Sequence, residues 1–143
     1  MIVNTKDFGN VEVEEEDVIY FPHGLYGFKQ YRRFALLSEK GKDSLFMWLQ
    51  CVDSPEPRFV VTDPHRIAKD YNIPPDAVKA VISLESEKDL RLLAITTVTA
   101  GTREAYANLK CPIVINAREN IAAQIILEAE DYPMRYYIIK KGE

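Results

Sequence analysis

The strand pattern that sets the fold class lies in residues 11–22, which read VEVEEEDVIYFP. Val11 and Val13 alternate with glutamates, and a period of two places the valines on a buried sheet face and the carboxylates in water. The alternation breaks in residues 14–17, which predicts a hairpin tip or a bulge. An apolar run in residues 18–21 then predicts a new strand, which the following proline ends. This pattern is typical of antiparallel β-structure.

Similar β-branched or aromatic runs, bounded by Gly, Pro, Asn or Asp, recur along the chain and predict further strands. They occupy residues 1–4, 33–38, 45–52, 58–62, 90–99, 112–116, 122–127 and 135–139. Helical signals are few: Asp63 as an N-cap before Pro64 predicts a short helix that runs to Tyr71, and another is expected in residues 75–80. We therefore predict a mainly β fold, a compact antiparallel β-barrel-like single domain over residues 1–143 with one or two short helices.

Composition limits the classes of function that the chain can have. The 143 residues are 47% apolar, enough for a core without disulfides, and they carry a net charge of −4. No apolar run approaches the ~20 residues of a membrane-spanning helix, and residues 1–7 lack the pattern of an export signal. We therefore expect a cytoplasmic protein with reduced cysteines. An acidic chain is a poor nucleic-acid binder but suits basic protein partners.

Residue types that carry chemistry form no recognisable catalytic or metal-binding pattern. His23 and His65 lie at no metal-ligand spacing from another histidine or cysteine. Cys51 shares a strand face with Leu49, which predicts a packing role rather than that of a nucleophile. The glycines of residues 24–28 lack the spacing and the following helix of a phosphate loop. We expect no catalytic residue, no cofactor, no metal and no small-molecule substrate.

Several segments, taken together and in order, resemble one known family. They are Phe21–Phe28 (FPHGLYGF), Phe46–Cys51 (FMWLQC), Val60–Pro64 (VVTDP), Asn108–Asn116 (NLKCPIVIN) and Gln124–Leu127 (QIIL). In this order and in a chain of this length they resemble the flagellar assembly factor FliW family, from Ile2 to about Ile139. Two positions depart from the family pattern: Cys111 stands where a small residue such as Ala is usual, and Lys29 where an acidic residue is common.

The resemblance implies an adaptor in flagellum biogenesis rather than an enzyme. FliW-like proteins bind flagellin in the cytoplasm and also bind CsrA, a small RNA-binding dimer that represses translation of the flagellin message. Binding to CsrA is direct and non-competitive with RNA. Because the same protein binds both CsrA and flagellin, flagellin synthesis is coupled to assembly. The implied partners are therefore CsrA and flagellin, with no direct nucleic-acid or membrane contact. Two alternatives stay open: an RNA-binding β-barrel module, and a small hydrolase that uses Cys51 or His65.

The candidate partner-binding residues fall into three groups. The first is an acidic patch expected to face CsrA, made of Glu12, Glu14, Glu15, Glu16 and Asp17. The second is Tyr26, which lies between anchoring positions of a turn that is either purely structural or presents this side chain to a partner. The third is Arg135, Tyr136 and Tyr137, because Tyr and Arg are enriched in binding hot spots and the two tyrosines point to opposite strand faces.

Overall fold

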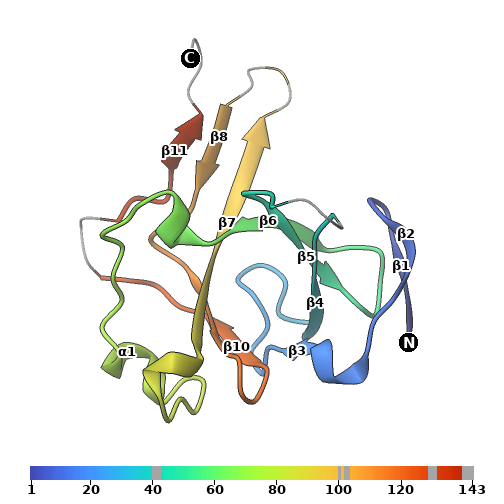
Figure 1. The fold of residues 1–143 in the computed structure, drawn as a ribbon, viewed down its shortest axis with the longest axis horizontal. Coiled ribbons are helices and arrows are strands. Elements are labelled where there is room, and N and C mark those ends of the chain that lie inside the picture. The colour runs from blue at the N-terminus through green and yellow to red at the C-terminus, as the bar shows by residue number, and fades with distance from the viewer. Residues whose placement is uncertain (40–42, 100, 102–103, 129–131, 140–143) are drawn as a thin grey trace.

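The computed structural model describes residues 1–39, 43–99, 101, 104–128 and 132–139 (Figure 1). Its strands are β1 (Ile2–Thr5), β2 (Gly9–Glu12), β3 (Ile19–Tyr20), β4 (Arg33–Leu37), β5 (Met47–Cys51), β6 (Arg58–Thr62), β7 (Leu90–Thr99), β8 (Glu104–Ala107), β9 (Ile113–Asn116), β10 (Ile121–Gln124) and β11 (Tyr136–Ile139). The helices are η1 (Glu15–Asp17), η2 (Pro64–Arg66), α1 (Asp76–Lys79) and η3 (Glu87–Asp89). No helix of this described part is long and apolar enough to cross a membrane.

The main sheet closes on itself through β7, its longest strand. Leu90–Leu93 pair with β9, while β6 and β8 pair with the second half of the strand. The order β7-β6-β5-β4-β3-β10-β9 therefore returns to β7 as a barrel. All these pairings are antiparallel except that of β10 with β3. β8 and β11 continue from β7 as an arm that projects beyond the barrel (Figure 1). The predicted mainly β, barrel-like class is confirmed.

The β1–β2 hairpin forms a separate small sheet that covers the outside of β4. Val3 and Val13 are buried against Ala35, and the Val13 N–H donates to the Met1 carbonyl. Val11 is partly buried and Glu12 is exposed, so the predicted separation of valines and carboxylates is confirmed. The break in the alternation is a 3₁₀-helix, η1, rather than a hairpin tip or a bulge.

Two apolar clusters hold the barrel and its cover together. The barrel interior contains Ile19, Phe21, Leu25, Phe34, Leu49, Cys51, Val61, Leu93, Ile113, Ile115 and Ala122. The second cluster lies between the outside of β7–β10 and residues 67–84, and it includes Val78 of α1. Val114 belongs to this outer cluster while Ile113 and Ile115 belong to the inner one, so β9 is buried on both faces.

Besides η1, the structure differs from the sequence-based expectations at η2, η3, β8 and β10. Helix η3 was not expected, and the strand predicted in residues 122–127 is β10, which ends at Gln124. The helix that begins at Pro64 is capped by Asp63, whose side chain accepts from the His65 N–H at 2.9 Å, but it ends at Arg66 rather than Tyr71. Tyr71 is buried in the outer cluster, and its hydroxyl donates to the Leu109 carbonyl at 2.7 Å. These tertiary contacts, rather than a continued helix, fix the position of Tyr71. Strand β8 was not expected, because its sequence EAYA contains no β-branched residue.

Truncation of Phe34 tests the inner core. Its fully buried ring lies 5.2 Å from that of Phe21 and 6.3 Å from that of Phe59, measured between centroids. We expect Phe34→Ala to lower the free energy of unfolding by about 3–5 kcal/mol in urea denaturation. Leu36→Ala, on the same strand but 38% exposed, should cost about 1 kcal/mol. Equal losses for the two variants would contradict the core assignment.

Thiol reactivity tests the placement of the cysteines. Both Cys51 and Cys111 are free and buried, and burial raises the pKa of the Cys51 thiol. Because the thiolate is the reactive form, neither thiol of the folded protein should react rapidly with dithionitrobenzoate at pH 8. Both should react after unfolding in guanidinium. A Ser38→Cys variant, whose new thiol is exposed, serves as the positive control, and rapid labelling of Cys51 in the folded chain would contradict the structure.

Candidate functional site

The predicted acidic patch lies around η1 at the outer end of the β1–β2 hairpin. Glu12, Glu14, Glu15, Glu16 and Asp17 are all exposed. Glu12 accepts a hydrogen bond from the amino terminus at 3.1 Å. Among the described residues, the side chains of residues 14–17 make no hydrogen bond and no ion pair. These four carboxylates are therefore directed to solvent, where a basic partner could reach them.

Tyr26 stands at the tip of a firmly anchored loop. Leu25 is buried in the barrel interior, and the Phe28 ring packs edge-on against Phe59 with 5.2 Å between centroids. The Tyr26 N–H donates to Gln124 Oε1 at 3.0 Å, yet the Tyr26 residue is 50% exposed. The loop is thus a structural turn that also holds the exposed Tyr26 side chain in a fixed position.

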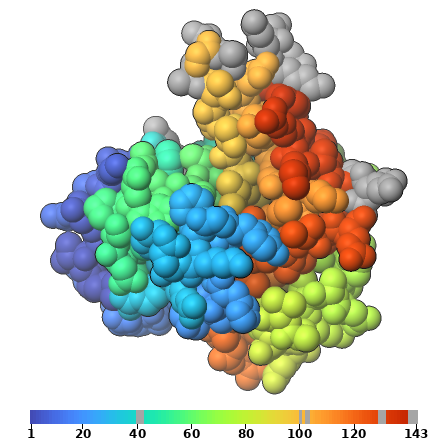
Figure 2. Space-filling model, turned by 180° about the vertical axis from the view of Figure 1, so that it is seen from behind, coloured from blue at the N-terminus to red at the C-terminus, as the bar shows by residue number. Residues whose placement is uncertain are grey.

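A groove of about 410 Å³ runs beside Tyr26. Its walls come from three segments that are distant in sequence: residues 23–32, Val81 after α1, and Ala123–Gln124 of β10. Figure 2 shows the first of these, in light blue, side by side with the lime segment that follows α1 and the orange C-terminal part. Sequence reasoning identified Tyr26 but not the groove, because no local pattern brings these walls together.

The third predicted group lies on the arm made by β7, β8 and β11. Tyr137 is exposed and its ring lies 5.5 Å from that of Tyr106, while the Arg135 guanidinium carbon is 5.2 Å from the Tyr106 ring centre. Tyr136 faces the other way, is partly buried in the outer cluster, and donates its hydroxyl to the Ile67 carbonyl at 3.2 Å. The opposite orientation of the two tyrosines is confirmed, and the partly buried Tyr106 joins Tyr137 and Arg135 in one cluster.

The predicted groups do not converge on one site. Figure 1 places β11 at the upper left of the molecule, whereas β3 and the preceding η1 lie at the lower right. The Tyr26 loop follows β3 directly in the chain, and η1 precedes that strand. The arrangement is that of separate surfaces rather than of a single reaction centre.

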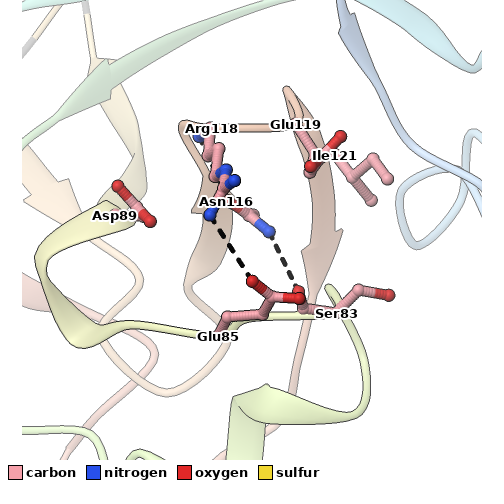
Figure 3. A pocket seen from close by; sticks show the side chains of 7 residues that line it. All are labelled: Ser83, Glu85, Asp89, Asn116, Arg118, Glu119 and Ile121. Carbon is pink, nitrogen blue, oxygen red and sulfur yellow. Dashed lines mark hydrogen bonds and ion pairs between the residues drawn. The ribbon is translucent and has the colours of Figure 1, made fainter.

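A polar pocket of about 260 Å³ lies at Asn116, and several of the polar side chains that line it bind one another or the backbone (Figure 3). The buried Asn116 amide donates to the carbonyls of Ile82 and Ser83 at 3.1 and 3.2 Å. Arg118 pairs with Glu85 at 3.4 Å. These contacts fasten the loop after α1 to the end of β9, so the pocket has a structural explanation.

The residues of the hydrolase alternative are not brought into contact. Cys51 lies in the barrel interior, and His65 is an exposed side chain whose Nε2 lies 3.0 Å from the Tyr71 carbonyl and whose Nδ1 lies 3.4 Å from Asp63. Within the described part of the chain, no hydrogen bond joins Cys51 to a histidine. No group of three or more His, Cys, Asp or Glu residues there is placed to hold a metal ion.

Comparison with known proteins agrees with this fold. A model of the FliW protein family matches residues 2–138. Flagellar assembly factor FliW of Caldanaerobacter subterraneus subsp. tengcongensis is 37% identical over 99% of this chain and 95% of its own, and that of Ruminiclostridium cellulolyticum is 35% identical over 97% and 95%. A crystal structure of the flagellar assembly factor FliW superposes with a TM-score of 0.86 at 31% identity, covering 97% of both chains. The resemblance drawn from the ordered motifs is thereby confirmed, and the chain belongs to the FliW family of flagellar assembly factors.

Proposed function

We propose that this protein is a non-enzymatic adaptor that binds flagellin in the cytoplasm and antagonises CsrA by direct, non-competitive binding. The observation that carries the proposal is the family match over residues 2–138. The geometry supports it, because the barrel interior is filled by apolar side chains, and the predicted partner-binding residues other than the partly buried Tyr136 are exposed. Such a molecule acts through surfaces that it offers to other proteins.

The acidic patch of Glu12 and residues 14–17 is the proposed CsrA-facing surface. An RNA-binding protein presents clustered Lys and Arg, and the carboxylates of residues 14–17, which form no ion pair within the described residues, attract such a surface and accelerate encounter. Rim charges of this kind change association rates more than they change affinity. Antagonism without competition then requires that binding of this protein lowers the affinity of CsrA for RNA. By linkage, bound RNA lowers the affinity of CsrA for this protein by the same factor.

The exposed aromatic residues are the proposed contribution to flagellin binding. Flagellin termini form amphipathic helices when packed, and an amphipathic helix lays its apolar face on an apolar groove or platform. Tyr137 and Arg135 with the partly buried Tyr106 form one such platform, and the exposed ring of Tyr26 is a second aromatic contact. Rigid tyrosines lose little conformational entropy on binding, which suits this role.

Charge reversal in the acidic patch tests the CsrA surface. We expect Glu14→Lys with Glu16→Lys to slow association with CsrA at low salt by at least about tenfold, because electrostatic steering is lost. Stopped-flow or biosensor kinetics would measure the rate, and thermal unfolding would check that the fold is intact. Asp70→Lys with Glu128→Lys changes the net charge equally at two exposed sites outside the patch and should leave the rate near that of the wild type.

The outcomes separate the proposal from its rivals. An association rate equal to that of the control pair would place the CsrA surface elsewhere. If the protein co-elutes with neither CsrA nor flagellin in size-exclusion chromatography at micromolar concentration, the adaptor function is wrong. A tight, steeply salt-dependent shift of the RNA alone would instead favour the RNA-binding barrel.

A further inference from the structure

The groove beside Tyr26 has a charge opposite to that of the protein as a whole. The chain has 22 acidic and 18 basic residues, yet the lining of the groove contains no carboxylate and includes His23, Lys29 and Arg32. Lys29 and Arg32 are exposed and, within the described residues, form no ion pair. A partner with carboxylates would meet two cations that no intramolecular acid neutralises.

The floor of the groove is apolar and continues past its cationic end. Val81 is exposed, and a second hollow of about 400 Å³ has a mostly apolar lining that includes Pro74, Ala77 and Ile126 but also the carboxylate of Glu128. Pro74 and Ala77 line the second hollow and Val81 lines the first, so the segment around α1 (Asp76–Lys79) contributes to both. On the facing wall, Ala123–Gln124 line the first hollow and the residues that follow them line the second. The two hollows are thus lined by adjacent parts of the same two segments, and we refer to them together as the furrow, which has cations at one end and a mostly apolar lining with Glu128 at the other.

The chain just beyond β10 is extended and is hydrogen-bonded along one edge. Beyond β10, the Ile125 N–H donates to the Pro112 carbonyl at 3.0 Å and the Leu127 N–H to the Lys110 carbonyl at 2.8 Å. Because backbone groups alternate between the two edges of a strand, the Ile126 N–H and carbonyl point the other way. Within the described part of the chain they have no hydrogen-bond partner. An extended peptide can add to such an edge.

The cationic end of the furrow is held in place before any partner arrives. Gly24 has φ +66°, and a Cβ at this position would lie 2.5 Å from the Lys29 Cα, so only glycine allows the backbone of residues 24 and 29 to pack this closely. Leu25 anchors the same loop in the barrel interior, and the exposed Phe28 ring packs against Phe59. Preorganisation of this kind lowers the entropic cost of binding.

We propose that this furrow is a docking site for an extended segment of a partner protein that carries carboxylates at one end and apolar side chains beyond them. The carboxylates would pair with Lys29 and Arg32, and an apolar side chain would lie against Val81, with the main chain along Ile126. A nucleic acid fits less well, because two or three cations and an apolar course offer few phosphate contacts in a chain of net charge −4. The inference depends on neither CsrA nor flagellin, so it can fail while the proposed function holds.

Labelled peptides test the docking site on the intact protein. Three fluorescein-labelled peptides of equal length would share their valines and carry Glu, Lys or Ser at the remaining positions. We expect the Glu peptide to bind with an affinity that falls as salt is raised, and the Lys and Ser peptides to bind at least about tenfold more weakly. Lys29→Glu with Arg32→Glu should lower the affinity for the Glu peptide by at least about tenfold.

A matched variant separates the site from net charge. Lys69→Glu with Lys88→Glu changes the charge equally at exposed positions outside the furrow and should keep wild-type affinity. Val81→Asp should weaken binding of the Glu peptide by repulsion at the apolar wall, and circular dichroism would confirm that each variant is folded. No binding of the Glu peptide up to about 1 mM, equal affinity for the Glu and Lys peptides, equal losses in the two charge variants, or displacement of the peptide by single-stranded RNA would overturn the proposal.

Discussion

The double pairing of β7 is the constraint on which the rest of the structure depends. Its first half pairs with β9 and its second half with β6 and β8, so a single strand both closes the barrel and carries the projecting arm. Closure buries β9 on both faces, with Ile113 and Ile115 inside and Val114 beneath the segment around α1. Because large side chains such as Phe21 and Phe34 fill the barrel, its interior is a packed core rather than a binding cavity.

A filled barrel leaves its loops and outer faces as the places where function can reside. Rigidity there comes from anchors that reach into the core, as Leu25 does below Tyr26 and as Asn116 does for the loop after α1. Charge then distinguishes one surface from another: carboxylates gather around η1, and unpaired cations rim the groove. A scaffold with fixed surfaces of opposite sign suits an adaptor, since partners are selected by electrostatic complementarity and mismatched charges are rejected.

Periodicity predicted the fold well wherever local sequence and tertiary contacts favour the same structure. β6 and β7 have the predicted bounds because β-branched residues fill them, and the alternation around Val13 indicated the buried face of the hairpin. β8 escaped prediction because its pairing with β7 and β11, not its own composition, makes it a strand. The exposure of Tyr26 could be inferred from its flanking anchors. The groove could not, because its walls meet only after the barrel closes.

The solvent-exposed surface of the protein is large enough for two partners to bind at the same time. Each standard interface covers about 800 Å² per partner, whereas the chain exposes 8718 Å². Exclusion of one partner by another would therefore have to arise from proximity or from mechanical coupling, not from lack of area. Proximity and a mechanical connection are both found at β3. This strand is only two residues long and directly joins the acidic patch to the Tyr26 loop. Asn120 ties these parts together, because its carbonyl accepts from the Tyr20 N–H and its side-chain amide donates to the Glu16 carbonyl. If η1 and the Tyr26 loop each contact a partner, these hydrogen bonds are a path by which one binding event would affect the other, and linkage would make the effect reciprocal.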